Sequence, residues 1–326
     1  MSRTTSTSTS TSTSNSTSTS ISKTALGSAP MPTTASQTWA SALPPPTFQF
    51  KGISDLNKLL ISDSTPEFFT IENVSTQDFA GIELAREKCR IQKFRLTLYS
   101  ADSKCLFITI PTGPHERLHG HLDDGIFREI VGMGLTHDLI RAGATIYQKW
   151  NSTGGTESAG EGDSARIPLS TRPLPSNFPT LVIEAGFSQS LSSLRQKAKW
   201  WFDVSGGDIK IVILAKLDQQ SQIIHLEKWK AIQLPPSAGV TTRTRAATAA
   251  AAPQSHCVQT IDISRTPGIN DTDPNRFDGA SYVITGGPLQ LEFMDLFLRK
   301  PIPPEADVVF SEEFLQEYAG IVWRAV

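Results

Sequence analysis

The sequence predicts a mixed α/β domain in which helices pack against a central sheet. Residues 180–185 and 209–217 are strongly apolar, strand-prone runs. Between them, apolar residues recur at spacings of three and four from Leu191 to Trp201, which places them on one face of a helix. Strands that alternate with an amphipathic helix in this way are typical of an α/β sheet covered by helices.

The remaining elements follow from hydrophobic periodicity and turn signals. We expect a helix over residues 76–90 and a β-hairpin made of strands 93–99 and 105–110, joined by the turn-forming sequence SADSK. Residues 115–141 carry apolar side chains near helical spacing and predict one long helix, or two helices broken at the sequence GMG. Further strands are expected at 144–150, 222–229, 258–263 and 281–284, and further helices at 289–298 and 311–323.

Composition divides the chain into four parts. Seventeen of the first twenty residues are Ser or Thr, so residues 1–48 have too little apolar surface to offset the entropy of ordering and are expected to be disordered. Residues 49–231 are expected to form the core with an N-terminal helix and hairpin, 232–256 a flexible linker, and 257–326 an α/β addition packed on the core. Residues 151–164, rich in Gly, Ser, Thr and Glu, are also expected to be flexible.

Charge and cysteine content exclude several classes of protein. The formal net charge of −2 argues against a strongly basic nucleic-acid binder, although a local basic patch stays possible. Three cysteines without a CxxC pair indicate free thiols rather than a disulfide framework or a thiolate zinc site. No apolar run approaches the ~20 residues that span a bilayer, and the N-terminus lacks the apolar segment of a secretory signal. We expect a cytoplasmic or nuclear protein with no membrane partner.

One segment of the chain resembles a known superfamily. The run PTLVIEAGFSQSLSSLRQKAKWWFDVSGGDIKIVILAKL, with an upstream P-x-S-x-R-P segment, resembles the PD-(D/E)XK, or restriction-endonuclease-like, superfamily, and is most similar to an uncharacterised branch from filamentous fungi. The resemblance extends over residues 115–229 and is most specific in 179–217. It implies a restriction-endonuclease-like α-β-β-β-α-β core. Active members hydrolyse phosphodiester bonds with Mg²⁺, using an aspartate on the second strand and Glu-x-Lys on the third.

Carried onto this chain, the resemblance places the metal-binding glutamate at Glu184. Two carboxylates on adjacent strands hold a hard cation, the cation activates water, and a lysine stabilises the developing anion. Gly186 stands where that lysine belongs, because residues i and i+2 of a strand share a face. Some branches move the lysine onto the following helix, which would make Lys197 the catalytic cation. Arg195 and Lys199 on the same helix are then candidate nucleic-acid contacts.

The second carboxylate of the site is not fixed by the sequence. The aligned Pro-Asp position is occupied by residues 168–169, a Pro-Leu pair, and leucine cannot ligate a metal. Asp163 and Glu161 lie nearby, in the segment expected to be flexible, and Glu129 on the first helix is a candidate auxiliary metal ligand. With one of three core positions intact, the leading hypothesis is a nuclease-like protein with a degraded metal site, which binds Mg²⁺ only if active and retains nucleic-acid or protein binding.

Two alternatives concern the same glutamate. The first is an active Mg²⁺-dependent nuclease that uses Glu184 with substitute ligands. The second is purely structural: a carboxylate at the end of a strand can accept hydrogen bonds from backbone N–H groups at the start of the next helix.

A third alternative comes from a competing motif, PHERLHGH, in which His115, Glu116 and His119 match H-E-x-x-H. In zincins the two histidines share a helix face and bind Zn²⁺, while the glutamate is the general base. Pro114, directly before the first histidine, and Arg117, inside the motif, are atypical of those enzymes. No third ligand is evident from the sequence. A zinc metallopeptidase therefore stays open as an alternative from a different enzyme class.

Overall fold

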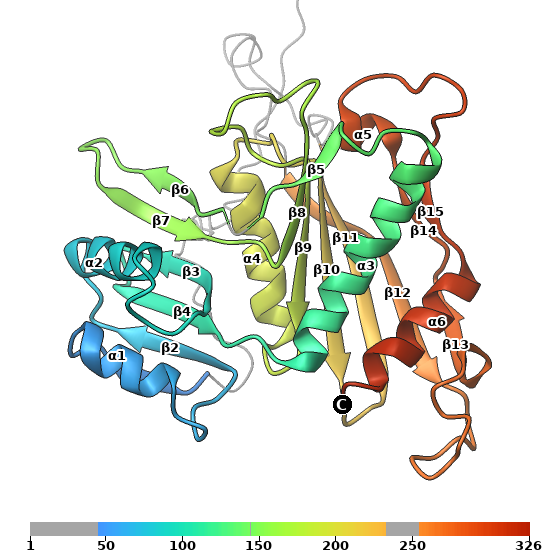
Figure 1. The fold of residues 1–326 in the computed structure, drawn as a ribbon, viewed down its shortest axis with the longest axis horizontal. Helices are drawn as coiled ribbons and strands as arrows, with labels where there is room; N and C mark the ends of the chain where they lie inside the picture. The colour runs from blue at the N-terminus through green and yellow to red at the C-terminus, as the bar shows by residue number, and fades with distance from the viewer. Residues whose placement is uncertain (1–44, 144, 233–253) are drawn as a thin grey trace, which may run out of the picture. The chain divides into compact units, whose positions relative to one another are not determined.

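The computed structural model describes residues 45–143, 145–232 and 254–326, which belong to one compact unit. Residues 1–44 of the predicted tail, and all but the ends of the predicted linker, lie outside the described part. The described residues form a mixed α/β fold with two large sheets flanked by helices (Figure 1). The mixed α/β class predicted from the sequence is therefore confirmed.

A six-stranded sheet contains the N-terminal part of the described chain and a later hairpin. Its strands run in the order β1-β2-β4-β3-β7-β6, and the predicted hairpin is the antiparallel pair β3 and β4. The helix α2 starts where expected because Ser75 caps it: its Oγ accepts a hydrogen bond from Asp78 N, and the Asp78 carboxylate accepts one from Ser75 N. The elements are β1 (Thr47–Gln49), α1 (Ile53–Leu60), β2 (Phe68–Glu72), α2 (Thr76–Glu87), β3 (Arg95–Ser100), β4 (Cys105–Thr109), β6 (Tyr147–Trp150) and β7 (Thr156–Gly160).

The second sheet has seven strands in the order β13-β12-β11-β10-β9-β8-β5. Strands β5, β8 and β9 pair antiparallel, and β10 then pairs parallel to β9 after the chain has crossed over through α4. Strands β11, β12 and β13 continue the sheet antiparallel. The elements are α3 (Gly113–Gly132), β5 (Leu139–Arg141), β8 (Ser164–Pro168), β9 (Leu181–Gly186), α4 (Leu191–Val204), β10 (Ile211–Asp218), β11 (Ile223–Ile232), β12 (Gln254–Arg265) and β13 (Tyr282–Thr285).

Helices cover both faces of the seven-stranded sheet (Figure 1). Alternate residues of β9 point to opposite faces, as expected of a strand. Leu181, Ile183 and Ala185 pack in the core that also contains α3 and the C-terminal helix α6 (Glu312–Trp323), whereas Val182 packs with α4. The residue between Ile183 and Ala185 therefore points toward α4. No helix in the described ranges combines the length and the apolar character needed to cross a membrane.

The helical region predicted over residues 115–141 ends early, because α3 stops at Gly132 and residues 139–141 form the strand β5. Two further predictions about individual segments are wrong. Residues 289–298 do not form one helix, because buried Leu289 and Leu291 alternate with an exposed glutamine and pair with a neighbouring strand. The segment instead contains β14 (Leu289–Leu291), which pairs with β15 (Val308–Phe310), and the short helix α5 (Phe293–Phe297). The 3₁₀ turn η1 (Gly279–Ser281) precedes β13.

The second error concerns residues 151–164, which are not simply a flexible connection. They contain β7 and reach the first residue of β8. The polar Glu161 is buried, and its carboxylate accepts hydrogen bonds from Leu96 N at 3.0 Å and from an Arg86 guanidinium nitrogen at 2.7 Å. The polar composition of this segment therefore belongs to a hydrogen-bonded interior, which composition alone cannot distinguish from a solvated loop.

Candidate functional site

The glutamate singled out in the sequence lies inside the fold, on the central strand β9. Glu184 is 1 % exposed and points toward α4. Its Oε2 accepts a hydrogen bond from Lys197 Nζ at 2.6 Å, and its Oε1 accepts one from Trp201 Nε1 at 2.5 Å. Burial raises the pKa of Glu184, although the charge of Lys197 opposes the shift. The partners of this carboxylate are side chains of α4, not backbone N–H groups at the start of that helix.

Lys197 reaches the glutamate because the helix α4 turns it toward the sheet. The helix begins at Leu191, where Ser190 accepts a hydrogen bond from Ser193 N. Lys197 lies one turn after Leu194 on the buried face and is 2 % exposed. A buried ammonium group is stable only when paired, and its Nζ also donates to the Glu161 carbonyl oxygen at 2.7 Å. The structure thus brings together the two predicted catalytic residues.

Gly186 explains why the cation comes from the helix and not from the strand. A Cβ atom at this position would lie 2.7 Å from Leu194 Cδ1 and 3.0 Å from the Gln189 carbonyl oxygen. The close approach of α4 therefore leaves no space for a lysine side chain on the strand. Lys197 instead extends from α4 and places its ammonium group beside Glu184.

A second carboxylate lies next to Glu184 at the start of β8. Ser164 pairs with Ile183, so the preceding residue Asp163 lies alongside Glu184. Its Oδ2 accepts a hydrogen bond from Ala185 N at 2.8 Å, and its side chain is 6 % exposed. Burial is the largest single influence and would raise the pKa of Asp163, but the interactions with His115, Lys197 and His119 together outweigh burial and hold that pKa well below its usual range.

The H-E-x-x-H motif lies beside this aspartate, in the first turns of α3. His115 and His119 are 1 % and 4 % exposed, whereas the Glu116 side chain is about half exposed. His115 Nε2 lies 3.4 Å from Asp163 Oδ2, and His115 Nδ1 lies 3.8 Å from Glu116 Oε1. His119 Nδ1 shares a 2.9 Å hydrogen bond with Ser164 Oγ, and its Nε2 lies 3.5 Å from Glu116 Oε1. The two motifs found separately in the sequence thus meet at Asp163.

Charges couple these groups although several of the contacts are too long or too poorly aligned to be hydrogen bonds. Burial is the largest single influence and would lower the pKa of His115, but its interactions with Asp163, Glu116 and Glu67 together outweigh burial and raise that pKa to about 10. Contacts with His115 and then with His119 lower the pKa of Glu116 well below its usual range. Both ring nitrogens of His115, and Nε2 of His119, are buried without a hydrogen-bond partner.

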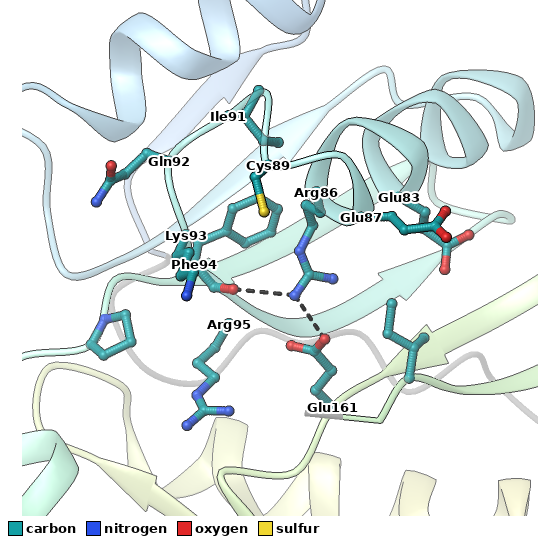
Figure 2. A pocket seen from close by; sticks show the side chains of 12 residues that line it. Glu83, Arg86, Glu87, Cys89, Ile91, Gln92, Lys93, Phe94, Arg95 and Glu161 are labelled. Atoms are coloured by element: carbon teal, nitrogen blue, oxygen red, sulfur yellow. Dashed lines mark hydrogen bonds and ion pairs between the residues drawn. The ribbon is translucent and has the colours of Figure 1, made fainter. Parts of the chain in front are cut away.

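A cavity of about 520 Å³ adjoins the cluster on the side of the six-stranded sheet. Figure 2 shows Arg86 between the Phe94 carbonyl oxygen and the Glu161 carboxylate, with Arg95 beside them. Arg95 links the cavity to the H-E-x-x-H motif, because its guanidinium nitrogen lies 3.9 Å from Glu116 Oε1. The cavity therefore presents cationic side chains close to the carboxylates of the site. Its lining includes Glu83, Arg86, Glu87, Cys89, Ile91, Gln92, Lys93, Phe94, Arg95, Pro111, Ile146 and Glu161.

The structure does not bring the other predicted residues to Glu184. Arg195 donates from Nε to the Glu227 carboxylate at 3.0 Å, so it forms an ion pair with strand β11. Lys199 is half-buried elsewhere on α4. Glu129 is exposed near the end of α3, roughly three and a half turns beyond the H-E-x-x-H glutamate.

The aspartate is the residue that sequence reasoning placed least well. The aligned position, Leu169, follows the other end of β8 and is 39 % exposed. From the sequence, Asp163 is only a nearby acid in a segment expected to be flexible. Its one usable signal was position, since it directly precedes the alternating stretch that becomes β8.

Within the described ranges, one group of His, Cys, Asp and Glu residues has ligand atoms close enough to share a metal ion. It consists of His115, Glu116 and His119, whose ligand atoms lie within 4.8 Å of one another. Comparison with known proteins assigns no family: no family model matches the chain, and no curated protein matches it significantly. Function must therefore be argued from the residues and geometry of this site.

Proposed function

We propose that the chain is a divalent-metal-dependent phosphodiester hydrolase of the PD-(D/E)XK type that acts on nucleic acid. Asp163 and Glu184 are the acidic metal ligands, and Lys197 is the cation that stabilises negative charge on the scissile phosphate. The observation that carries the proposal is the 2.6 Å contact between Lys197 Nζ and Glu184 Oε2. Glu184 lies directly opposite the buried carboxylate of Asp163 in the antiparallel pairing of β8 with β9.

The order of elements around the site supports this assignment. Helix α3 precedes the antiparallel strands β5, β8 and β9, after which α4 crosses over to the parallel strand β10. This is the α-β-β-β-α-β order of the superfamily core, with β6 and β7 inserted as a hairpin between the first two strands. Asp163 directly precedes the second strand of that series and Glu184 lies on the third, which supports the assignment of the two carboxylates to the metal-binding positions that the resemblance implies.

The donor set fits a hard divalent cation. Carboxylate oxygens on adjacent strands are the ligands that Mg²⁺ and Mn²⁺ prefer. When bound, such an ion supplies activation of water and neutralisation of phosphate charge. Asp163 and Glu184 hold the ion, and Ala185 N fixes one oxygen of Asp163 through a 2.8 Å hydrogen bond. Lys197 Nζ lies 2.6 Å from the Glu184 carboxylate, where a cationic group would stabilise a developing anion.

The surroundings of the site suit an anionic substrate. Lys93 and Arg95 line the adjoining cavity, and Arg95 lies between that cavity and the half-exposed Glu116. Cationic side chains at such positions contact phosphate oxygens and orient a nucleic-acid strand without reading its sequence. The lining also contains Glu83, Glu87 and Glu161, the last of them paired with Arg86, so Lys93 and Arg95 are the cations that we assign to substrate contact.

The same geometry weighs against the other hypotheses. Asp163 and Lys197 fill the two positions that Leu169 and Gly186 leave empty in the sequence, which favours an active site over a degraded one. His115 and His119 share a helix face, as a zinc peptidase needs. However, Glu116 lies with them as a third ligand, so no general base is left at the motif.

A cleavage assay tests the proposal. Wild-type protein is incubated with supercoiled plasmid, single-stranded DNA and RNA in Mg²⁺ or Mn²⁺, with EDTA as the metal-free control. We expect metal-dependent cleavage that falls roughly 10²-fold or more in Asp163→Asn and in Glu184→Gln. The exposed acid provides the matched control: Glu129→Gln should cleave like the wild type.

Folding of the variants is checked by circular dichroism and thermal melting. Because Glu184→Gln leaves Lys197 unpaired, the double variant Glu184→Gln with Lys197→Met removes both buried charges and is assayed beside it. The absence of cleavage by wild-type protein on all three substrates would refute the proposal. Cleavage that survives in folded Asp163→Asn and in the folded double variant would refute it equally.

A further inference from the structure

We propose that the first two turns of α3 form a separate binding site for a transition-metal ion such as Zn²⁺. Its ligands are His115 Nδ1, His119 Nε2 and Glu116 Oε1, which we call the α3 triad. The site is distinct from the carboxylate pair of Asp163 and Glu184, and it does not depend on the hydrolase proposal.

The distances within the α3 triad fit one small ion. Glu116 Oε1 lies 3.5 Å from His119 Nε2 and 3.8 Å from His115 Nδ1. Zinc bonds of 2.0–2.2 Å in a tetrahedral site separate neighbouring ligand atoms by about 3.4 Å. The carboxylate oxygen therefore lies within a few tenths of an ångström of that separation from each ring. All three ligand atoms lie within 4.8 Å of one another, so binding one ion also requires the two rings to turn slightly toward each other. The helix supplies the remaining geometry, because histidines at i and i+4 share one face.

The start of β8 orients both rings. Metal-bound histidines commonly donate their other ring N–H to a carboxylate, a carbonyl or a hydroxyl group, which fixes the tautomer and the ring plane. Here Asp163 Oδ2 faces Nε2 of His115 at 3.4 Å, and Ser164 Oγ bonds Nδ1 of His119 at 2.9 Å. When an ion displaces the proton from an inner nitrogen, the outer nitrogen keeps its own proton and the lone pair of the inner nitrogen points toward Glu116.

The inner nitrogens lack any other partner. His115 Nδ1 and His119 Nε2 are buried without a hydrogen bond. Buried polar atoms in folded proteins are paired in about nine cases of ten, so two adjacent unpaired ring nitrogens call for a ligand. An ion coordinated by both nitrogens and by Glu116 satisfies all three atoms together.

The chemistry of the donors selects the type of ion. Imidazole nitrogens favour Zn²⁺, Co²⁺ and other borderline metals, whereas Mg²⁺ prefers oxygen ligands. Three protein ligands leave a fourth position for water or for an anionic oxygen. Because Glu116 is about half exposed, that position faces solvent on the side of Arg95. The two proposed sites therefore differ in metal preference and can be titrated separately.

Isothermal titration with Zn²⁺ and visible absorption with Co²⁺ test the α3 triad. We expect one ion per chain and the intense visible bands of four-coordinate Co²⁺. Glu116→Gln and His119→Gln should weaken Zn²⁺ binding by at least about 100-fold, and Ser164→Ala by about 10-fold. The matched control is His121→Gln: this histidine is two residues further along the same helix, and its ring stacks on Phe314 at 5.8 Å.

The outcomes separate this site from the hydrolase proposal. Glu184→Gln should leave Zn²⁺ affinity within about threefold of wild type, so failure of the cleavage assay has no bearing on the α3 triad. Glu116→Gln changes a half-exposed side chain and keeps the fold, which melting checks. The proposal is overturned if wild-type protein shows no saturable 1:1 binding, or if Glu116→Gln and His119→Gln bind Zn²⁺ as tightly as wild type.

Discussion

Two buried acid-base groups connect α3 with the β8 segment, one at the middle of the helix around Asp123 and one in its first two turns around His115, and they are built differently. In the Asp123 group, Arg166 donates from Nε to Asp123 Oδ1 at 2.5 Å and from its two terminal nitrogens to the carbonyl oxygens of Leu139 and Asp123. Arg141 Nε donates to the other oxygen of the same carboxylate, at 2.5 Å. In the His115 group, His115 faces Asp163 across 3.4 Å and keeps both ring nitrogens without hydrogen bonds.

The Asp123 group and the His115 group differ in how completely their polar atoms are hydrogen-bonded, not in how deeply they are buried. Asp123 and Arg166 are 2 % and 1 % exposed, as deeply buried as His115 and His119. A fully bonded ion pair has no capacity left for a ligand and serves the fold alone. Unbonded ring nitrogens beside a half-exposed carboxylate retain that capacity, at a cost in stability that a bound ion would offset.

The largest change in the free energy of unfolding is expected in the Asp123 group, whose polar atoms are fully hydrogen-bonded. Asp123→Ala should lower the free energy of unfolding by roughly 3–5 kcal/mol, because it leaves the Arg166 guanidinium buried without its partner. The neighbouring Asp124→Ala is the control. Its side chain is 62 % exposed and pairs only with Arg141, so its loss should stay below about 1 kcal/mol. Urea denaturation measures both, and similar losses in the two variants would contradict the comparison.

Binding of Zn²⁺ should stabilise the His115 group, whose ring nitrogens lack hydrogen bonds in the metal-free protein. Zn²⁺ at 100 times its dissociation constant should raise the free energy of unfolding by about 2.7 kcal/mol. Wild-type protein and Asp124→Ala should both show this gain, whereas His119→Gln should not. Chemical denaturation with and without EDTA measures it. An equal gain in His119→Gln would place the ion elsewhere in the chain.

Local periodicity predicted much of the fold and part of the site. The helical spacing that places Lys197 on the buried face of α4, and both histidines on one face of α3, is visible in sequence because it depends on neighbouring residues. Asp163 is different. Its role depends on which strand pairs with β9 and in what register, and the GTESAGEGD segment that precedes β8 has no clear alternation.

Glu161 shows the same limit from the opposite side. Its segment is polar and glycine-rich, which favours a solvated loop in any reading of composition. In the fold, its carboxylate and its carbonyl oxygen bind groups from three other elements: Arg86 of α2, Leu96 of β3 and Lys197 of α4. Contacts with such distant parts of the chain leave no local pattern in the sequence, so the burial of Glu161 could not be predicted from it.

A smaller effect is expected where α4 approaches β9. Gly186→Ala should destabilise the protein by about 1–3 kcal/mol, because the new Cβ meets Leu194 Cδ1 and the Gln189 carbonyl oxygen. Gly120→Ala on α3 is the control: nothing lies within 4 Å of its added Cβ, so it should be neutral or stabilising by up to about 1 kcal/mol. Urea unfolding of both variants measures the difference. A neutral Gly186→Ala would remove the steric explanation for a lysine supplied by α4.

The smallest change in the free energy of unfolding is expected for His119→Leu, and it is the sharpest test of the comparison between the Asp123 group and the His115 group. In EDTA, His119→Leu should stay within about 1 kcal/mol of wild type although the side chain is only 4 % exposed. The leucine replaces a ring whose Nε2 is buried and unbonded and whose one hydrogen bond goes to Ser164, a partly exposed residue. Removing Asp123, by contrast, strands a buried charge. If His119→Leu lowered the free energy of unfolding of the metal-free protein by about 3 kcal/mol, this histidine would stabilise the fold as the Asp123 pair does. The contrast between the Asp123 group and the His115 group would then fail.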